Sequence, residues 1–242
     1  MVTSTDNGLP PSRLFRSFWQ AGFESATHRN RKRRRVDMIA ATQHLEHADA
    51  DYALLRDMDI LVAREGVRWP LVEAGGEYDF SSLAPLVEAG RRHGIQIMWT
   101  LCHYGWPDDL DVFAPAFVDR FARYCGAVAR FIAAGDAGVP FYSPMNEISF
   151  LAFAGGQVGW FYPYAHDRGD ELKAQLVRAA IAGIEALWAV DPRARIAHVD
   201  PIINVVAASR RPGQTASAAA QHASQFAAWD WLAGRARPEL GG

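Results

Sequence analysis

Five short apolar runs, separated by stretches with helical periodicity, limit the possible folds of this chain more than any other feature. A new run starts about every 40 residues, which leaves room for one helix between successive runs. This alternation indicates a parallel sheet, because each helix returns the chain to the edge where the next strand begins. We expect strands at residues 14–23, 60–67, 95–101, 139–145 and 195–199, and helices at residues 49–58, 82–93, 116–133, 172–188 and 218–232.

The alternation continues without a break in composition, so we expect a single α/β domain over residues 14–242 after a disordered leader at residues 1–13. Ser81 is placed to cap the second helix, and Gly94 to end it in a left-handed conformation. The Gly- and Tyr-rich residues 155–170 are expected to form a long loop at the rim of the sheet.

Charge and cysteine content exclude several classes of protein. The net charge of -2 provides no general attraction for nucleic acid or an anionic membrane, so the basic run at residues 29–35 is interpreted as a solvated loop. The N-terminus lacks the pattern of a signal peptide, and no apolar run reaches the ~20 residues needed to cross a bilayer. Cys102 and Cys125, one on a strand and one on a helix, are expected to be buried thiols of a cytoplasmic protein.

Polar residues follow the apolar runs at the points where four of the strands end. Because the carboxyl ends of parallel strands lie at one edge of a sheet, we expect these side chains to surround one mouth. A carboxylate held there against Trp106, Phe150 and Trp160 would have a raised pKa and suit general acid catalysis. The polar residues are Gln20 or Glu24, Arg64, His103, and the adjacent Asn146 and Glu147.

Metal and cofactor sites are not expected. His44, Glu46 and His47 do not have the spacing of a His-Glu-x-x-His motif, and no third ligand group stands nearby. The chain also lacks the glycine-rich motifs that bind dinucleotides or nucleotide phosphates. A barrel enzyme with a Schiff-base lysine is discounted, because Lys32 and Lys173 lie in an expected loop and helix.

Four stretches resemble glycoside hydrolase family 1, the β-glucosidase-like branch of the retaining glycosidases. Ala63-Arg-Glu-Gly-Val-Arg-Trp69 keeps the Arg and Trp of the family's second strand, and Tyr78-Asp-Phe-Ser-Ser-Leu83 is similar to the segment that follows. Thr100-Leu-Cys-His-Tyr-Gly-Trp-Pro107 resembles the family's Thr-Leu-x-His-Trp/Phe-Asp-Leu-Pro, with Gly105 in place of an acidic residue. Asn146-Glu147-Ile148 stands where the family has Asn-Glu-Pro.

The resemblance implies a (β/α)8 TIM-barrel type of fold, of which this chain holds about the first five β/α units. It also implies hydrolysis of O-glycosyl bonds in a small carbohydrate or glycoside substrate, with Glu147 as the acid/base residue. Asn146 would bind the sugar 2-hydroxyl, His103 another hydroxyl, and Arg64 would orient a carboxylate. Gln20, Glu24 and Trp106 are further expected substrate contacts; neither the sugar nor the oligomeric state follows from the sequence.

A retaining mechanism also needs a nucleophilic carboxylate about 5–5.5 Å from the acid/base residue, and the resemblance places it after a seventh strand. The later glutamates are Glu171 and Glu185, within an expected helix, and Glu239, in a polar tail. We therefore expect a fragment without turnover by itself, whose open sheet exposes two edges. The alternative is a catalytically dead carbohydrate-binding or interaction module.

Overall fold

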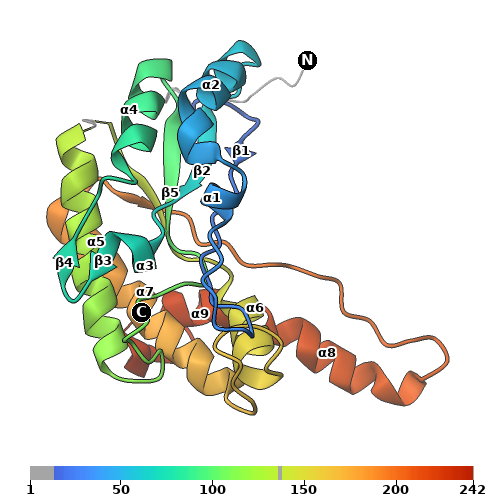
Figure 1. The fold of residues 1–242 in the computed structure, drawn as a ribbon. Helices are drawn as coiled ribbons and strands as arrows, with labels where there is room; N and C mark the ends of the chain where they lie inside the picture. The colour runs from blue at the N-terminus through green and yellow to red at the C-terminus, as the bar shows by residue number, and fades with distance from the viewer. Residues whose placement is uncertain (1–13, 136–137, 242) are drawn as a thin grey trace.

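The computed structural model describes residues 14–135 and 138–241, and in this part of the chain the main sheet has five strands (Figure 1). The strand order is β1-β2-β5-β6-β7, and every neighbouring pair is parallel. The predicted parallel sheet is therefore confirmed. Its strands are β1 (Ala21–Gly22), β2 (Val62–Gly66), β5 (Gln96–Cys102), β6 (Phe141–Met145) and β7 (Arg195–Ile196).

The sheet does not close into a barrel within the described residues. β1 pairs only with β2, and β7 only with β6, so both are edge strands. Beyond β7, the pairing continues as one bridge between Asn146 and Val199. A separate antiparallel hairpin is formed by β3 (Glu73–Ala74) and β4 (Glu77–Tyr78).

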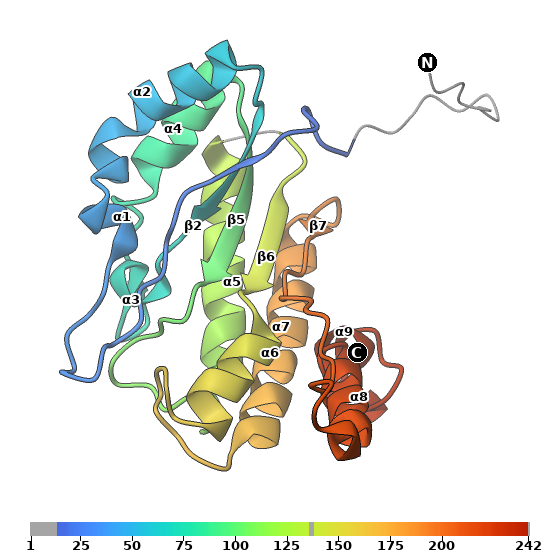
Figure 2. The same ribbon diagram turned by 90° about the vertical axis from the view of Figure 1, so that its right-hand side faces the viewer.

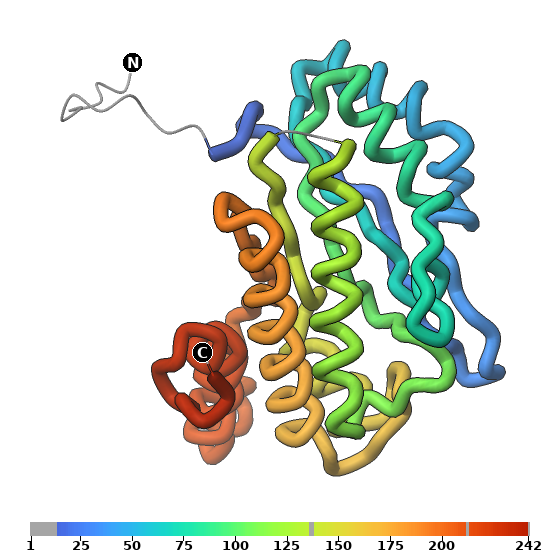
Figure 3. Tube along the Cα trace, turned by 90° about the vertical axis from the view of Figure 1, so that its left-hand side faces the viewer, coloured from blue at the N-terminus to red at the C-terminus, as the bar shows by residue number. Residues whose placement is uncertain are grey.

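Long helices cover one face of this sheet (Figure 3). They are α2 (His44–Asp57), α4 (Ala84–His93), α5 (Ala116–Gly135) and α7 (Gly169–Val190). The buried side of α5 repeats at helical spacing, and its members are Phe117, Phe121, Tyr124, Cys125, Val128 and Ile132. Gly183 lets α7 approach α5 closely, because a Cβ there would lie 2.9 Å from the Cys125 sulfur. Both cysteines are buried free thiols, as predicted.

The shorter elements connect the sheet and its helices. They are α1 (Met38–Ala41), α3 (Trp69–Val72), α6 (Ile148–Leu151), η1 (Ala152–Gln157), η2 (Pro212–Gln214), α8 (Thr215–Ser224), α9 (Ala227–Leu232) and η3 (Pro238–Leu240). No helix of the described part is long and apolar enough to span a bilayer.

Several predicted boundaries differ from the structure. Of the first predicted strand, only Ala21–Gly22 forms, and the chain before it runs along the sheet without forming a strand (Figure 2). There the Arg16 amide donates a hydrogen bond to the side-chain oxygen of Gln96, and the Gln96 side-chain amide donates one to the Leu14 carbonyl. Ser81 does not cap α4, because its amide turns back to Asp79. Gly94 ends α4 in the left-handed region, with φ 67°, as predicted.

The later boundaries differ in the same way. The predicted final helix is divided into α8 and α9. Residues 155–157 of the predicted rim loop instead belong to the helical turns of η1. The leader at residues 1–13 lies outside the described residues.

Two fully buried carboxylates hold helices and loops to the core. The Glu65 carboxylate accepts a 2.6 Å hydrogen bond from the Tyr52 hydroxyl and lies 2.8 Å from His44 Nε2, while His44 Nδ1 lies 2.6 Å from Asp51. Burial disfavours the charged form of His44, but the bonds and charges of Glu65 and Asp51 outweigh it and raise its pKa. His44 thus joins α2 to β2. The second carboxylate, Glu73, is bound by Arg120 of α5.

Candidate active site

Two of the predicted site residues meet across β5 at the carboxyl ends of the strands. Arg64 of β2 donates a 2.9 Å hydrogen bond from Nε to the hydroxyl of Thr100, and a second one from Nη2 to the side-chain oxygen of Asn146. Arg64 and Thr100 lie on the sheet face away from the long helices, because neighbouring residues such as Glu65 contact α2. Burial lowers the pKa of Arg64, while the charges of Glu147 and Glu24 act to raise it.

Glu147 follows β6 in a left-handed conformation, with φ 49°. Its amide donates a 3.0 Å hydrogen bond to the Val199 carbonyl, which fixes the backbone, and its carboxylate accepts a hydrogen bond from the Tyr104 hydroxyl. Burial, followed by the negative charge of Asp200, raises the pKa of Glu147; Glu24 adds to this effect and Arg64 opposes it. A half-buried carboxyl group with a raised pKa is suited to donate a proton near neutral pH.

His103 lies after β5 and faces the segment that follows β1. Its Nδ1 is 2.9 Å from the Ser25 hydroxyl and 3.6 Å from the Glu24 carboxylate. Burial lowers the pKa of His103 to about 4, against the opposing charge of Glu24 and with a further lowering by Arg64. The ring is therefore neutral at pH 7 and can exchange hydrogen bonds with a hydroxyl group without carrying charge.

The structure separates the two alternatives at the first strand. Glu24 follows β1, and its carboxylate accepts hydrogen bonds from the amides of Ser25 and Ala26 at 2.9 and 2.8 Å. Gln20 is exposed and precedes β1, so it lies at the amino end of the strand. The expectation for Gln20 was wrong because the strand is much shorter than the apolar run.

The predicted aromatic wall is also only partly correct. Trp106 is 1% exposed and packs against Phe117 and Tyr162, so its face is not available to a sugar. Trp160 is 67% exposed and packs on Phe153. The aromatic ring bonded to Glu147 is instead Tyr104, and Phe150 lies against it, with ring centroids 5.7 Å apart.

The basic run at residues 29–35 forms a small hairpin, closed by a bridge between Arg29 and Arg35. Both of these arginines pair with Asp108, and Arg35 also donates hydrogen bonds to the carbonyls of Thr27 and Trp106. Residues 31–34 at the tip are exposed. The hairpin is therefore held to the loop that follows His103.

Two residues beside Glu147, Tyr104 and Asp200, were not among the predicted site residues. The signal for Asp200 is in the sequence, since Asp200 is the first carboxylate after the fifth apolar run. The Tyr104 contact had no such signal. Tyr104 has a φ of 65°, so the direction of its side chain depends on a tight turn after β5.

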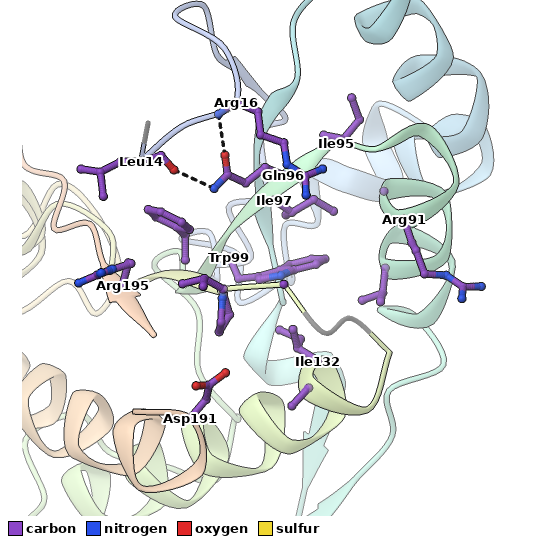
Figure 4. A pocket seen from close by; sticks show the side chains of 17 residues that line it. Leu14, Arg16, Arg91, Ile95, Gln96, Ile97, Trp99, Ile132, Asp191 and Arg195 are labelled. Carbon is purple, nitrogen blue, oxygen red and sulfur yellow. Dashed lines mark hydrogen bonds between the residues drawn. The ribbon is translucent and has the colours of Figure 1, made fainter. Parts of the chain in front are cut away.

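A cavity of about 350 Å³ lies at the opposite, amino ends of the strands (Figure 4). Its walls include Arg16, Gln96, Trp99 and Asp191, and none of the predicted site residues lines it. A second cavity, of about 470 Å³, lies between α6, α7 and α8 and is mainly apolar. Within residues 14–135 and 138–241, no group of three His, Cys, Asp or Glu side chains is arranged to hold a metal ion.

The fold is similar to those of several solved structures. The AHE enzyme from Alicyclobacillus herbarius is 22% identical, covers 74% of this chain and gives a TM-score of 0.66. The virulence factor SghA from Agrobacterium tumefaciens, also solved with its substrate analogue salicin, is 19% identical, covers 77% and gives 0.68. A family 1 β-glucosidase from Thermotoga maritima is 18% identical, covers 65% and gives 0.59.

This chain spans about two fifths of the length of those structures: 42%, 43% and 38%, respectively. No protein-family model matches the sequence, and no curated protein matches it. At these identities the likeness concerns the fold alone. The α/β fold of this chain, with its parallel sheet, matches a portion of each of these larger structures.

Proposed function

We propose that this chain carries the acid/base part of a retaining glycosidase site, which acts on O-glycosyl bonds of β-glucoside-like substrates. The observation that carries this proposal is the setting of Glu147. It follows a central strand, lies next to Asn146 and its partner Arg64, and has a raised pKa caused by burial and by Asp200. The likeness of the fold to that of β-glucosidases supports the same reading.

The neighbouring polar groups supply the contacts that a sugar ring needs. The neutral ring of His103 and the amide of Asn146 would bind hydroxyl groups, and Arg64 holds the Asn146 amide in one orientation. Glu24 can accept a further hydroxyl hydrogen bond, since its exposed carboxylate uses one oxygen for backbone amides. Trp106 and Gln20 are not part of the proposed site.

The proposed chemistry begins with protonated Glu147. It donates its proton to the glycosidic oxygen as the bond from that oxygen to the anomeric carbon breaks, the leaving group departs as an alcohol, and the anomeric carbon forms a bond to the carboxylate nucleophile that the mechanism requires. In the second step the Glu147 carboxylate takes a proton from the attacking water, which releases the sugar from the nucleophile and restores the acid. These roles require one side chain to serve both as acid and as base.

The nucleophile has no candidate among the later glutamates of the described chain. Glu171 and Glu185 lie on α7, and Glu239 lies in η3. We therefore expect no turnover by the 242-residue chain alone. Binding of carbohydrate without hydrolysis is the second candidate function, favoured by this lack and by the open edges of the sheet. The partial TIM barrel, its single domain and the cytoplasmic location stay predictions.

The test is to express the chain as given and to measure two properties, hydrolysis of aryl glycosides of several sugars and binding of salicin by calorimetry. We expect binding that is weakened by Asn146→Ala, and no hydrolysis. Turnover abolished by Glu147→Gln, but not by Glu171→Gln on the exposed side of α7, would establish the hydrolase and contradict the expectation that this chain lacks a nucleophile. If the chain neither binds nor hydrolyses any of the sugars, the proposed function is contradicted.

A further inference from the structure

A second carboxylate, Asp200, is built into the structure next to Glu147. β6 and the segment after β7 run side by side here, because Asn146 forms a bridge with Val199 and the Glu147 amide donates to the Val199 carbonyl at 3.0 Å. Asp200 directly follows Val199, whose carbonyl fixes the Glu147 backbone. Its side chain has no exposed surface.

Asp200 is held in one place by the first turn of α6. Both of its carboxylate oxygens lie 3.1 Å from the amide of Ser149, two residues after Glu147. The Ser149 hydroxyl in turn donates to the carbonyl of Gln225 at 3.4 Å. The same short segment thus carries Glu147 and fixes the charge beside it.

The geometry does not suit Asp200 to attack a sugar. A nucleophile must present a carboxylate oxygen to the anomeric carbon, whereas both oxygens of Asp200 are buried against the Ser149 amide. What a buried, fixed carboxylate does instead is disfavour a second negative charge close to it. Glu147 is the group that this charge acts on.

The other charged and titratable groups around Glu147 and Asp200 act in both directions. Arg64 on β2 favours the ionised form of Glu147, as does the hydroxyl of Tyr104, while Glu24 after β1 disfavours it. His198 Nε2 lies 3.6 Å from Asp200 and would offset its charge when protonated. Among the charges, that of Asp200 raises the pKa of Glu147 most, and only burial has a larger effect.

We propose that Asp200 is a positioning residue that acts through Glu147 by disfavouring the ionised form of its carboxyl group. This inference rests on the proposed function only for the use to which the proton is put. The effect on the proton itself is a property of the protein without substrate. In this arrangement a buried aspartate after β7 adds a negative charge to the effect of burial, and both favour the protonated form of the acid.

The test is a carboxyl-carbon NMR titration of the whole chain labelled at glutamate, with Glu147→Gln used to identify the Glu147 signal. Asp200→Asn removes the charge and keeps an oxygen for the Ser149 amide. Asp200→Ser is the second variant, in case the amide does not fit. Glu185→Gln, a glutamate on α7, is the matched control for loss of one negative charge.

We expect the Glu147 titration midpoint to fall in Asp200→Asn or Asp200→Ser and to stay at the wild-type value in Glu185→Gln. A folded Asp200 variant with an unchanged midpoint would overturn the inference and leave Asp200 as a structural cap for α6. The outcome is separate from the proposed function. An ordinary Glu147 midpoint in the wild-type chain would count against Glu147 as the acid, whatever Asp200 does.

Discussion

Replacement of Arg120 by methionine tests how strongly the buried carboxylate of Glu73 depends on its partner. Glu73 has no exposed side-chain surface and accepts hydrogen bonds from Arg120 Nε at 2.8 Å and Nη2 at 3.0 Å. The indole of Trp69 and the amide of Gly76 donate to it as well, at 3.2 and 2.7 Å. Methionine keeps most of the volume of the arginine side chain but removes the charge and the donors.

The loss of one partner of a buried ion pair costs about 3–5 kcal/mol, because the other charge is left uncompensated. We expect about 3 kcal/mol here, since Trp69 and Gly76 still donate to Glu73. The second partner of Arg120, Asp109, is 64% exposed and contributes at most about 1 kcal/mol. Against a typical stability of about 5–15 kcal/mol, the variant would lose a large part of its folding free energy.

The assay is urea unfolding followed by tryptophan fluorescence. With an m-value of about 3 kcal/mol/M, the midpoint should fall by about 1 M. Glu73→Gln in the same variant should recover part of the loss, because the amide leaves no unpaired charge. Arg123→Met, an exposed position on the same helix, is the control. If Arg120→Met and Arg123→Met unfold at the same midpoint, the reasoning about Glu73 is refuted.

Two further predictions concern pH and close packing. Because its folded-state pKa is raised, His44 stabilises the protein below its ordinary pKa of about 6.5, and this contribution is lost as pH rises through the raised value. The difference in unfolding free energy between wild type and His44→Asn should therefore be largest below about pH 6.5 and shrink as the pH rises through the raised pKa of His44; a difference independent of pH would contradict this. Gly105→Ala should cost about 1–3 kcal/mol in thermal unfolding, because the new Cβ would lie 2.4 Å from the Thr27 carbonyl oxygen. Gly213→Ala is the control, because an added Cβ at Gly213 meets nothing within 4 Å. Equal stability of Gly105→Ala and Gly213→Ala would contradict the prediction, because it would show that the loop around Gly105 moves to make room for the methyl group.

The crowding at Gly105 also gives a physical reason for one departure from the glycoside hydrolase family 1 pattern. The family has an acidic residue at this place, whereas here the Thr27 backbone occupies the space. Arg35 donates a 2.7 Å hydrogen bond to the same Thr27 carbonyl, and Asp108 pairs with Arg35. The basic hairpin and Gly105 are therefore parts of one packing arrangement, which the separate sequence motifs did not reveal.

The element order and the edge at which Arg64, Asn146 and Glu147 lie could be predicted from the sequence. Both follow from local patterns: apolar runs predict the strands, and parallel strands bring their carboxyl ends to one edge. The extent of each strand could not be predicted in the same way. Residues 14–20 have the apolar character of a strand, but Leu14 and Arg16 bind the side chain of Gln96 and only Ala21–Gly22 pairs with β2, so Gln20 precedes the strand instead of following it.

By itself, the sequence determined that this chain forms a parallel α/β sheet and that a carboxylate follows its fourth strand, because periodicity and strand ends are local properties. Only the tertiary structure decided which groups surround that carboxylate. Tyr104 reaches Glu147 through a left-handed turn, Trp106 is buried by packing against α5, and Asp200 lies beside Glu147 through pairing across the sheet. The pKa of an acid depends on burial and on charges distant in sequence, so it is decided where the strands meet.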